Sequence, residues 1–269
     1  MENGVILVGC GNMGHAMLAG WLRAGKLRAS GVIVIEPAQP LRERAADLGV
    51  VALASAGEIA AGTSPRLVIF AVKPQIILDV VPAYARFSGA TFLSVAAGTP
   101  IAAFERLLGD RAAVIRCMPN TPAAIGKGMM VLVSNDRVAP STFDFVGDLL
   151  AVNGEVATIA DEALMDAVTA VSGSGPAYVF HFIECLSAAA QAAGLPSETA
   201  RLLAMQTVYG AASLAAESRE DPAELRRQVT SPNGTTAAAL SVLMGEDRLK
   251  TLVGVAVEAA KTRSIELGK

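Results

Sequence analysis

The chain has 269 residues, of which 52% are hydrophobic and 17% are charged, with a formal net charge of −3. This balance excludes a disordered chain, and the small negative charge, without runs of like charge, argues against nucleic acid or an anionic membrane as a partner. The length fits two domains of moderate size. The cysteines have no CxxC spacing and no signal-peptide pattern precedes the first motif, so we expect a cytoplasmic protein.

Short β-branched runs alternate with helical patterns through the first half of the chain, which is typical of a parallel α/β sheet. Strands are predicted over residues 5–9, 32–36, 67–72, 91–97 and 113–118 and, on either side of a further helix, over residues 129–134 and 155–160. The uncharged stretch 87–104 is nearly long enough to cross a bilayer, but Gly89, Gly98 and Pro100 interrupt it. We therefore expect a buried strand, a loop and the start of a helix in this stretch.

The pattern changes after Asp161. Strands stop there, and apolar residues recur at three- and four-residue spacing to the end of the chain. The sequence therefore predicts an α/β domain over residues 1–160 and an all-helical domain over residues 161–269. Alanine-rich segments such as CLSAAAQAAGL indicate helices packed closely within one chain or between chains, which is a hint of oligomerisation.

The segment GCGNMG places Gly9, Gly11 and Gly14 in a GxGxxG pattern directly after a predicted strand and before a helix. In that setting the glycines allow a tight turn, close approach to a pyrophosphate and close helix packing, with the phosphates at the helix N-terminus. Glu36 ends the second predicted strand, roughly 20 residues further on, where an acid accepts hydrogen bonds from a ribose. GxGxxG alone also fits an ordinary strand-to-helix turn, but strand, helix, second strand and acid together predict a dinucleotide site.

Few side chains offer acid–base or metal chemistry. His15, after the glycine loop, and His181, within a predicted helix, are interpreted as structural, and no HExxH or Cys/His cluster is present, so no metal site is predicted. Lys73 in AVKPQ follows a predicted strand at the edge where α/β sheets bind ligands, and Pro74 forces it out of helical geometry. A solvated lysine in a loop is the alternative interpretation.

Two hydroxyl- and glycine-rich segments precede predicted helices: SGSGPAY over residues 172–178 and TSPNGTT over residues 230–236. The start of a helix has free backbone N–H groups and attracts an anion, although ordinary helix capping explains either segment by itself. Beside a dinucleotide site, the pair favours a small carboxylate substrate. The hydroxyl groups of Ser231, Thr235 and Thr236 form hydrogen bonds but are not strong acids or bases, which favours an electrophilic substrate such as an imine.

Six segments have the order and intervals of the pyrroline-5-carboxylate reductase family: GCGNMG, AVKPQ, SVAAG, RCMPNTP, SGSGPAYVF and VTSPNGTT. This resemblance spans the whole chain. It implies a Rossmann-type dinucleotide-binding domain followed by an all-helical dimerisation domain. The reaction it implies is reduction of 1-pyrroline-5-carboxylate to L-proline, the last step of proline biosynthesis, with hydride from NADPH or NADH. It also implies a homodimer with interlocked helices, in which each active site is shared between chains, and a possible decamer of five dimers.

The resemblance further implies roles for individual residues. Those expected to contact the cofactor are Gly9, Cys10, Gly11, Asn12, Met13, Gly14, Glu36, Ala71, Val72, Lys73, Pro74, Ala97, Gly98 and Asn120. Those expected to contact the substrate are Ser174, Ser231, Gly234, Thr235 and Thr236. Backbone N–H and hydroxyl groups would hold the substrate carboxylate. Thr236 would face the ring nitrogen and is the expected catalytic residue.

Two departures from the family pattern concern the adenosine end of the cofactor. Many relatives carry Asn or Ser with a basic residue after the second strand, where this chain has Glu36 and Pro37. Many also have an Asn that contacts the ribose, and ASAGEIA contains none. Since a carboxylate repels a 2′-phosphate, we expect NADH to be preferred, although Arg42 and Arg44 lie close enough in sequence to reach a phosphate.

Three alternatives stay open. A β-hydroxyacid dehydrogenase would share the first domain but carry a lysine one helical turn beyond a glycine motif, where this chain has His181 and no lysine. A reductase of another cyclic or open imine would place its substrate in the same way. A non-catalytic nucleotide sensor would keep GCGNMG without needing the two anion-binding segments.

Overall fold

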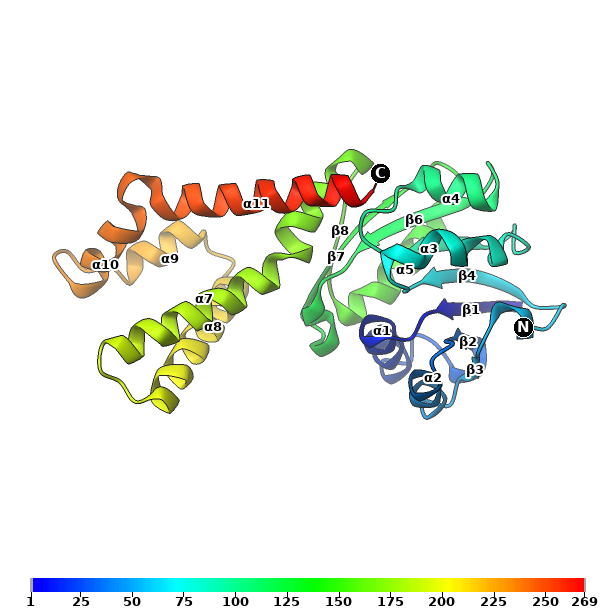
Figure 1. Cartoon of the computed structure of the whole chain (residues 1–269), viewed down its shortest axis with the longest axis horizontal. Helices are drawn as coiled ribbons and strands as arrows, with labels where there is room; N and C mark the ends of the chain where they lie inside the picture. The colour runs from blue at the N-terminus through cyan, green and yellow to red at the C-terminus, as the bar shows by residue number, and fades with distance from the viewer. Residues whose placement is uncertain (1, 269) are drawn as a thin grey trace. The chain divides into compact units, whose positions relative to one another are not determined.

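A computed structural model describes residues 2–268 (Figure 1). Their strands form one eight-stranded sheet in the order β3-β2-β1-β4-β5-β6-β7-β8, and every neighbouring pair is parallel except β6 and β7. The strands are β1 (Glu2–Val8), β2 (Val32–Ile35), β3 (Val51–Leu53), β4 (Ser64–Phe70), β5 (Thr91–Ser94), β6 (Ala113–Met118), β7 (Gly128–Ser134) and β8 (Gly154–Thr158). Strand β1 pairs with β2 on one side and β4 on the other, so the order of connection reverses beside it.

Contacts divide the chain into two units. The sheet unit runs to Ser174 and takes in the chain from Ala260 onward, and the helical unit is Gly175–Ala259. The helices up to that division are α1 (Asn12–Arg23), α2 (Gln39–Ala46), α3 (Pro74–Val80), α4 (Ile101–Leu108), α5 (Pro140–Leu150) and α6 (Met165–Val168). The later helices are α7 (Gly175–Ala192), α8 (Ser197–Ser218), α9 (Pro222–Gln228), α10 (Thr235–Met244) and α11 (Arg248–Leu267).

The predicted fold class, an α/β sheet followed by helices, is confirmed, and each predicted strand is present. Strand β3 was not predicted: it has three residues, pairs only with β2 at the sheet edge, and begins with the exposed Val51. So short an edge strand has no hydrophobic period to reveal it in a sequence. The uncharged stretch 87–104 contains β5 and the start of α4, as predicted. Among residues 2–268, no helix is long and apolar enough to cross a membrane.

Side chains alternate along β1 between two cores. Val5 and Leu7 pack into one core with residues of α1, α2 and α5. Ile6 and Val8 pack into the other core with residues of α3 and α4. Because helices cover both faces, the central strands are hydrophobic throughout, as a buried parallel sheet requires. Each such side chain stabilises the fold by ~1.5–3 kcal/mol on full burial.

Polar contacts attach both the segment after β8 and the end of α11 to the sheet unit. Glu162 pairs with the buried Arg116 of β6, and Asp166 accepts a hydrogen bond of 2.6 Å from the Ser264 hydroxyl of α11. The sequence places a domain boundary at residue 160, after the last strand, whereas the contacts carry the sheet unit to Ser174. The two divisions differ because these contacts join segments that the hydrophobic pattern does not connect.

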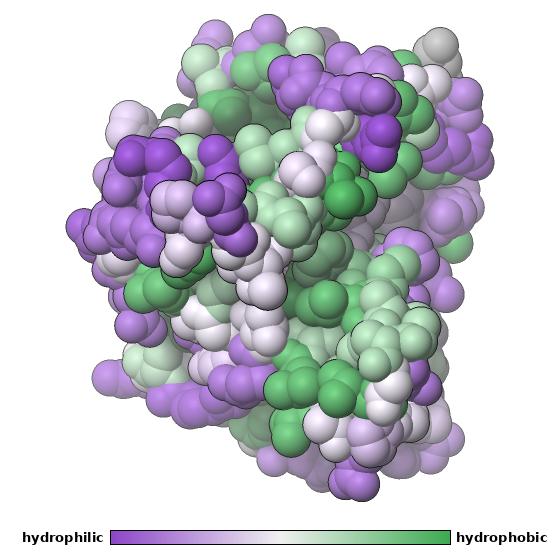
Figure 2. Space-filling model, turned by 90° about the vertical axis from the view of Figure 1, so that its left-hand side faces the viewer, coloured by the Kyte–Doolittle hydropathy of each residue, from purple (hydrophilic) through white to green (hydrophobic). Residues whose placement is uncertain are grey.

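The helical unit has almost no core of its own. Within residues 175–259, the buried hydrophobic residues are Ala200 and Ala204 alone. Large apolar side chains are instead exposed: Val179, Phe180, Phe182, Leu202, Leu203, Met205, Leu214, Val242, Leu243, Leu252, Val253 and Val255. Figure 2 shows apolar residues gathered on the face that these helices present. A surface of this kind, on a unit without a core, requires a covering partner.

We expect the protein to be at least a dimer in solution, because a second copy of the chain offers a self-complementary apolar surface. Light scattering should give at least twice the mass of one chain. Leu252→Glu places a charge where the side chain is 67% exposed, so it should shift the protein towards monomer. A wild-type protein that is monomeric during turnover would contradict this prediction.

Candidate functional site

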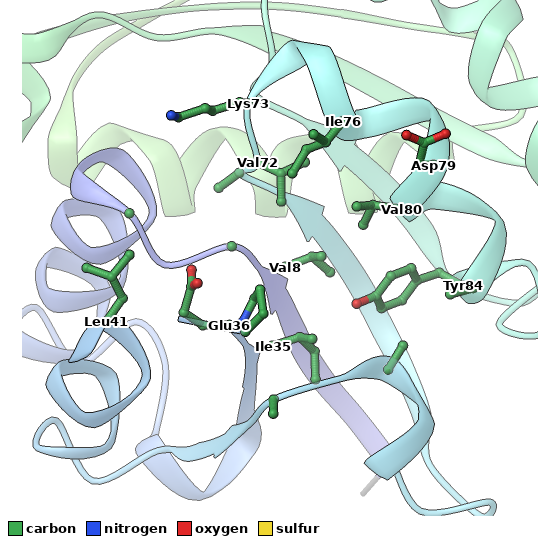
Figure 3. A pocket seen from close by; sticks show the side chains of 17 residues that line it. Val8, Ile35, Glu36, Leu41, Val72, Lys73, Ile76, Asp79, Val80 and Tyr84 are labelled. Atoms are coloured by element: carbon green, nitrogen blue, oxygen red, sulfur yellow. The ribbon is translucent and has the colours of Figure 1, made fainter. Parts of the chain in front are cut away.

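The carboxyl ends of β1, β2 and β4 surround a cavity of about 530 Å³ in the sheet unit (Figure 3). Open parallel sheets bind ligands in this position, beside the strand where the order of connection reverses. Predicted cofactor residues that line the cavity are Gly9, Gly11, Glu36, Ala71, Val72 and Lys73. The remaining walls come from α2, from the loop after β3, from α3 and from the following 3₁₀ helix η3 (Val81–Tyr84).

The three glycines of the predicted loop differ in the space that the chain leaves for a side chain at each position. Gly9 has a φ of +87°, and an added Cβ would lie 2.8 Å from the Ala71 carbonyl oxygen. A Cβ on Gly14 would lie 2.5 Å from the Gly9 carbonyl oxygen. A Cβ on Gly11 would meet no atom of the chain within 4 Å. The turn therefore needs Gly9 and Gly14 for its own packing, and it leaves space at Gly11 for close approach of a ligand.

The N-terminus of α1 is free for a negatively charged group. The helix begins at Asn12, its N-cap is Gly11, and no side chain caps it. The first backbone N–H groups of an uncapped helix, together with the helix dipole, attract an anion such as a pyrophosphate. Met13 continues the same first turn. The predicted phosphate-binding segment thus has the geometry that its sequence indicates.

Glu36 connects the glycine loop to the end of β2. Its side chain is only 7% exposed. One carboxylate oxygen accepts a hydrogen bond of 2.8 Å from the Cys10 N–H, and the other accepts one of 3.0 Å from the Ala38 N–H. A carboxylate has about four acceptor positions, so two remain for ligand hydroxyl groups. Glu36 therefore has a fixed orientation at the cavity.

Two arginines flank Glu36, and both are anchored by backbone carbonyl groups. One Arg42 nitrogen donates to the carbonyl oxygens of Glu36 and Pro37, each at 2.9 Å. An Arg44 nitrogen donates to the Cys10 carbonyl oxygen at 3.1 Å. Both guanidinium groups are therefore held by the backbone of the loops that form the site.

Lys73 is the N-cap of α3, and Pro74 is the first residue of that helix. The backbone of Lys73 is extended, with φ −63° and ψ 143°, so the prediction that Pro74 keeps it out of helical geometry is confirmed. The side chain is exposed at the rim of the cavity (Figure 3). Ala71 and Val72 precede it and form part of the apolar wall.

Three predicted nicotinamide-side residues lie outside this cavity. Ala97 and Gly98 follow β5, and Gly98 has a φ of +77°. Asn120 follows β6 and is bonded at both ends of its side-chain amide: its oxygen accepts from the Met129 N–H at 2.9 Å, and its nitrogen donates to the Ser172 carbonyl oxygen at 3.2 Å. Asn120 therefore fixes the neighbouring segments in place, a role that sequence reasoning missed.

Sequence reasoning also missed the far wall of the cavity. Ile76, Asp79, Val80 and Tyr84 follow Lys73 in the chain and face the cavity from α3 and η3 (Figure 3). Their spacing of three and four residues indicates one face of a helix, which in a sequence alone suggests only packing. The strand order is needed to show that this face borders the dinucleotide crevice.

The histidines and cysteines supply no strong acid or base to the cavity. Burial and, secondarily, the charge of Arg44 hold the pKa of His15 below its ordinary value. His181 lies on an exposed face of α7, where its Nδ1 atom is 3.1 Å from a Glu184 carboxylate oxygen. Burial raises the pKa of the Cys10 thiol to about 11, so it is protonated at neutral pH. Among residues 2–268, no group of three or more His, Cys, Asp and Glu residues is arranged to hold a metal ion.

The hydroxyl-rich turn before α10 lies in the helical unit. Helix α10 begins at Thr235, its N-cap is Gly234, and no side chain caps it. The Gly234 N–H donates to the Ser231 carbonyl oxygen at 3.0 Å, which closes the turn. Within the described chain, no residue hydrogen-bonds to the hydroxyl groups of Ser231, Thr235 or Thr236. These hydroxyl groups and the first helical N–H groups are free for a ligand, and Thr236 is not a helix cap.

The segment SGSGPAY differs from its prediction. It is not a loop before a helix, because Thr169–Gly173 forms a π-helical turn that continues to α7. The Ser174 N–H donates to the Thr169 carbonyl oxygen at 2.9 Å, so the backbone is satisfied within the helix. The nearest atom to a Cβ on Gly173 would be the terminal methyl group of Met118, which is the end of a flexible side chain. The predicted free helix start is therefore absent, while substrate contact by Ser174 stays a prediction.

Two family models match the chain. The model described as pyrroline-5-carboxylate reductase dimerisation matches residues 162–267. The model described as NADP oxidoreductase, coenzyme F420-dependent, matches residues 4–98. Among curated proteins, a pyrroline-5-carboxylate reductase of Pseudomonas aeruginosa is 40% identical over 98% of this chain and 97% of its own length.

Solved structures are similar along the whole chain. A pyrroline-5-carboxylate reductase from Coxiella burnetii has a TM-score of 0.92 and 32% sequence identity, and the match covers 100% of both chains. A pyrroline carboxylate reductase from Plasmodium falciparum, solved with NADP bound, has a TM-score of 0.85 and 29% identity over 100% of this chain and 99% of the other.

Gly11→Ala should leave the fold intact and weaken dinucleotide binding. The added methyl group meets no atom of the chain within 4 Å, and the φ of −64° suits alanine. It occupies the space through which a pyrophosphate approaches the turn, so we expect at least ~10-fold weaker NAD⁺ binding, equivalent to ~1.4 kcal/mol. Calorimetric titration and thermal melting measure the two effects. Gly31→Ala, also without a contact within 4 Å, is the control; wild-type NAD⁺ affinity in Gly11→Ala would contradict this role.

Proposed function

Because the chain belongs to the pyrroline-5-carboxylate reductase family, we infer that it reduces 1-pyrroline-5-carboxylate to L-proline, the last step of proline biosynthesis. It is an oxidoreductase that uses a nicotinamide cofactor. The observation that carries this function is 40% identity to a named reductase over 98% of the chain. Oxidation of NADH and NADPH should be assayed with pyrroline-5-carboxylate, a six-membered cyclic imine and an imine without a carboxylate. Turnover of another imine in preference to pyrroline-5-carboxylate would overturn the substrate assignment.

The sheet unit holds the cofactor in this proposal. The free N–H groups at the start of α1 take the pyrophosphate, and the open space at Gly11 admits it. Glu36 accepts hydrogen bonds from the adenosine ribose with the lone pairs that Cys10 and Ala38 leave unused. Lys73, exposed at the rim, adds a positive charge near the phosphates.

The nicotinamide end is assigned to the loops after β5 and β6. Ala97 and Gly98 offer backbone and little side-chain bulk there, which permits close approach of a flat ring. Asn120 acts through its backbone position, because its side-chain amide is occupied by Met129 and Ser172. When bound, the reduced nicotinamide supplies the hydride that adds to the carbon of the imine C=N bond.

The helical unit holds the substrate through the turn before α10. The uncapped start of α10 and the hydroxyl groups of Ser231 and Thr235 bind the substrate carboxylate. The Thr236 hydroxyl donates a hydrogen bond to the ring nitrogen and helps a proton reach it as the hydride arrives. Holding both ends of so small a ring fixes its orientation. Placement of this kind lowers a barrier by up to ~7–11 kcal/mol, which is sufficient without a strong acid.

The chain works as an oligomer formed through residues 162–267. We propose a homodimer in which the helical unit of one protomer completes the site of its partner. The exposed apolar residues of a unit whose buried hydrophobic residues are Ala200 and Ala204 support this arrangement. Assembly of five dimers into a decamer and a cytoplasmic location are further proposals.

Thr236→Ala should lower kcat more than it raises KM. The lost hydrogen bond matters most as charge changes on the ring nitrogen, and a hydroxyl that mainly orients should contribute ~100-fold or less. Thr236→Ser should recover much of the loss because it keeps the hydroxyl group.

Steady-state kinetics and thermal melting of both Thr236 variants test this role. Since Gly234 is the N-cap of α10, Thr236→Ala removes no capping bond and should melt near the wild-type temperature. Normal turnover by Thr236→Ala, with or without a loss of stability, would exclude a catalytic role.

NADH should support a higher kcat/KM than NADPH. The Glu36 carboxylate is buried and held by two backbone N–H groups, so it cannot turn away from a 2′-phosphate. Arg42 and Arg44 already donate to backbone carbonyl oxygens. Glu36→Gln removes the negative charge at nearly constant size and should lower the NADH-to-NADPH ratio of kcat/KM. A wild-type enzyme with higher kcat/KM for NADPH would contradict the preference.

A further inference from the structure

Tyr84 closes the end of the cavity opposite Glu36 (Figure 3). It is the last residue of η3 and is 1% exposed. Its ring packs edge-on against Phe70 of β4, with centroids 5.4 Å apart, and lies 6.4 Å from the ring of Phe87. These contacts fix the direction of the ring, and therefore the position of the hydroxyl group at its tip.

The Tyr84 hydroxyl faces the cavity and has no partner in the chain. Figure 3 shows its oxygen directed towards the space between β1 and α3. Nothing among residues 2–268 hydrogen-bonds to it. The hydroxyl oxygen is accessible from the cavity, so it can pair with a bound ligand, and a tyrosine hydroxyl between apolar walls normally has such a partner. Burial also raises the pKa of Tyr84 above its ordinary value, so the group is protonated and can both donate and accept.

The walls between Glu36 and Tyr84 indicate the kind of group that this hydroxyl meets. They consist largely of apolar side chains, among them Ile35, Val72 and Val80. A slot of this kind suits a flat ring with polar atoms at its edge, and ligand sites typically combine apolar walls with a few placed polar groups. Of the parts of a dinucleotide whose ribose is at Glu36, the adenine base is such a ring.

We propose that the Tyr84 hydroxyl is the hydrogen-bond partner of the adenine base and selects for it in the cofactor. The assignment rests on the proposed use of a nicotinamide dinucleotide in this cavity. Tyr84 is thus a cofactor-binding residue that acts on affinity and not on the hydride-transfer step.

Tyr84→Phe removes the hydroxyl and keeps the ring that packs on Phe70 and Phe87. Calorimetric titration with ADP-ribose, which contains adenine but no nicotinamide, should show about 2- to 12-fold weaker binding than in wild type, as expected for one neutral hydrogen bond. Tyr209→Phe, which removes the hydroxyl of an exposed tyrosine in the helical unit, is the matched control and should bind as wild type.

Kinetics with two hydride donors distinguish a specific role of Tyr84 at the adenine base from a general effect of the substitution on the site. With NADH, kcat/KM of Tyr84→Phe should fall by the same factor as ADP-ribose affinity, with kcat unchanged. With reduced nicotinamide mononucleotide, which lacks adenine, kcat/KM should equal that of wild type. Equal losses with both donors, or ADP-ribose binding as tight as in wild type, would overturn the proposal.

The proposal can fail separately from the proposed function. ADP-ribose binding needs no turnover, so it decides the role of Tyr84 even if the protein does not reduce pyrroline-5-carboxylate. Conversely, an active reductase whose ADP-ribose affinity is unaffected by Tyr84→Phe keeps its function and loses this assignment. Failure of the wild-type protein to bind ADP-ribose would overturn the placement of the adenine base in this cavity.

Discussion

The close packing of α1 against β1 and β4 at the glycine turn is the constraint on which the cofactor site depends. Gly14 lies against the Gly9 carbonyl group, and Gly9 lies against Ala71 at the end of β4, so neither position has room for a Cβ. This packing lets the helix begin at the edge of the sheet with its first N–H groups free. It also brings the Cys10 N–H within 2.8 Å of Glu36, which ties the end of β2 to the same turn.

Polar side chains that are buried or partly buried fix the positions of the loops at this edge of the sheet. Loops at strand ends lack the regular hydrogen bonds of strands and helices, so their buried backbone groups need side-chain partners. Glu36 accepts from the Cys10 N–H in the loop after β1, Glu162 accepts from the Ile101 N–H at the start of α4, and Asn120, which lies in the loop after β6, accepts from the Met129 N–H of β7. Glu162 also balances the charge of the buried Arg116. The surfaces proposed to contact the cofactor are therefore held in place by residues that are not expected to react.

The two units obtain their stability differently. The sheet unit has an apolar core on each face of its sheet, and large side chains such as Trp21 and Phe104 are almost fully buried. The helical unit exposes its large side chains and buries chiefly alanines. Its hydrophobic free energy therefore becomes available mainly on association with another copy. In the proposed arrangement, in which this unit carries the substrate-binding turn, assembly of the oligomer is a condition for assembly of the active site.

The sequence by itself determined the α/β and helical halves and the glycine loop, because hydrophobic period, glycine spacing and turn residues are local properties of the chain. It also led to the family, through motifs whose order spans the chain. Only the tertiary structure decided that the Asn120 side chain joins β7 to the segment at Ser172, that SGSGPAY is part of a helical segment, and that Tyr84 borders the cavity at the carboxyl ends of β1, β2 and β4. The first and third depend on contacts between segments distant in sequence, and the second on a π-helical turn, closed by the Ser174 N–H and the Thr169 carbonyl oxygen, that hydrophobic period does not reveal. Which distant segments come into contact is set by the strand order and packing of the whole sheet, and a local sequence pattern does not contain this information.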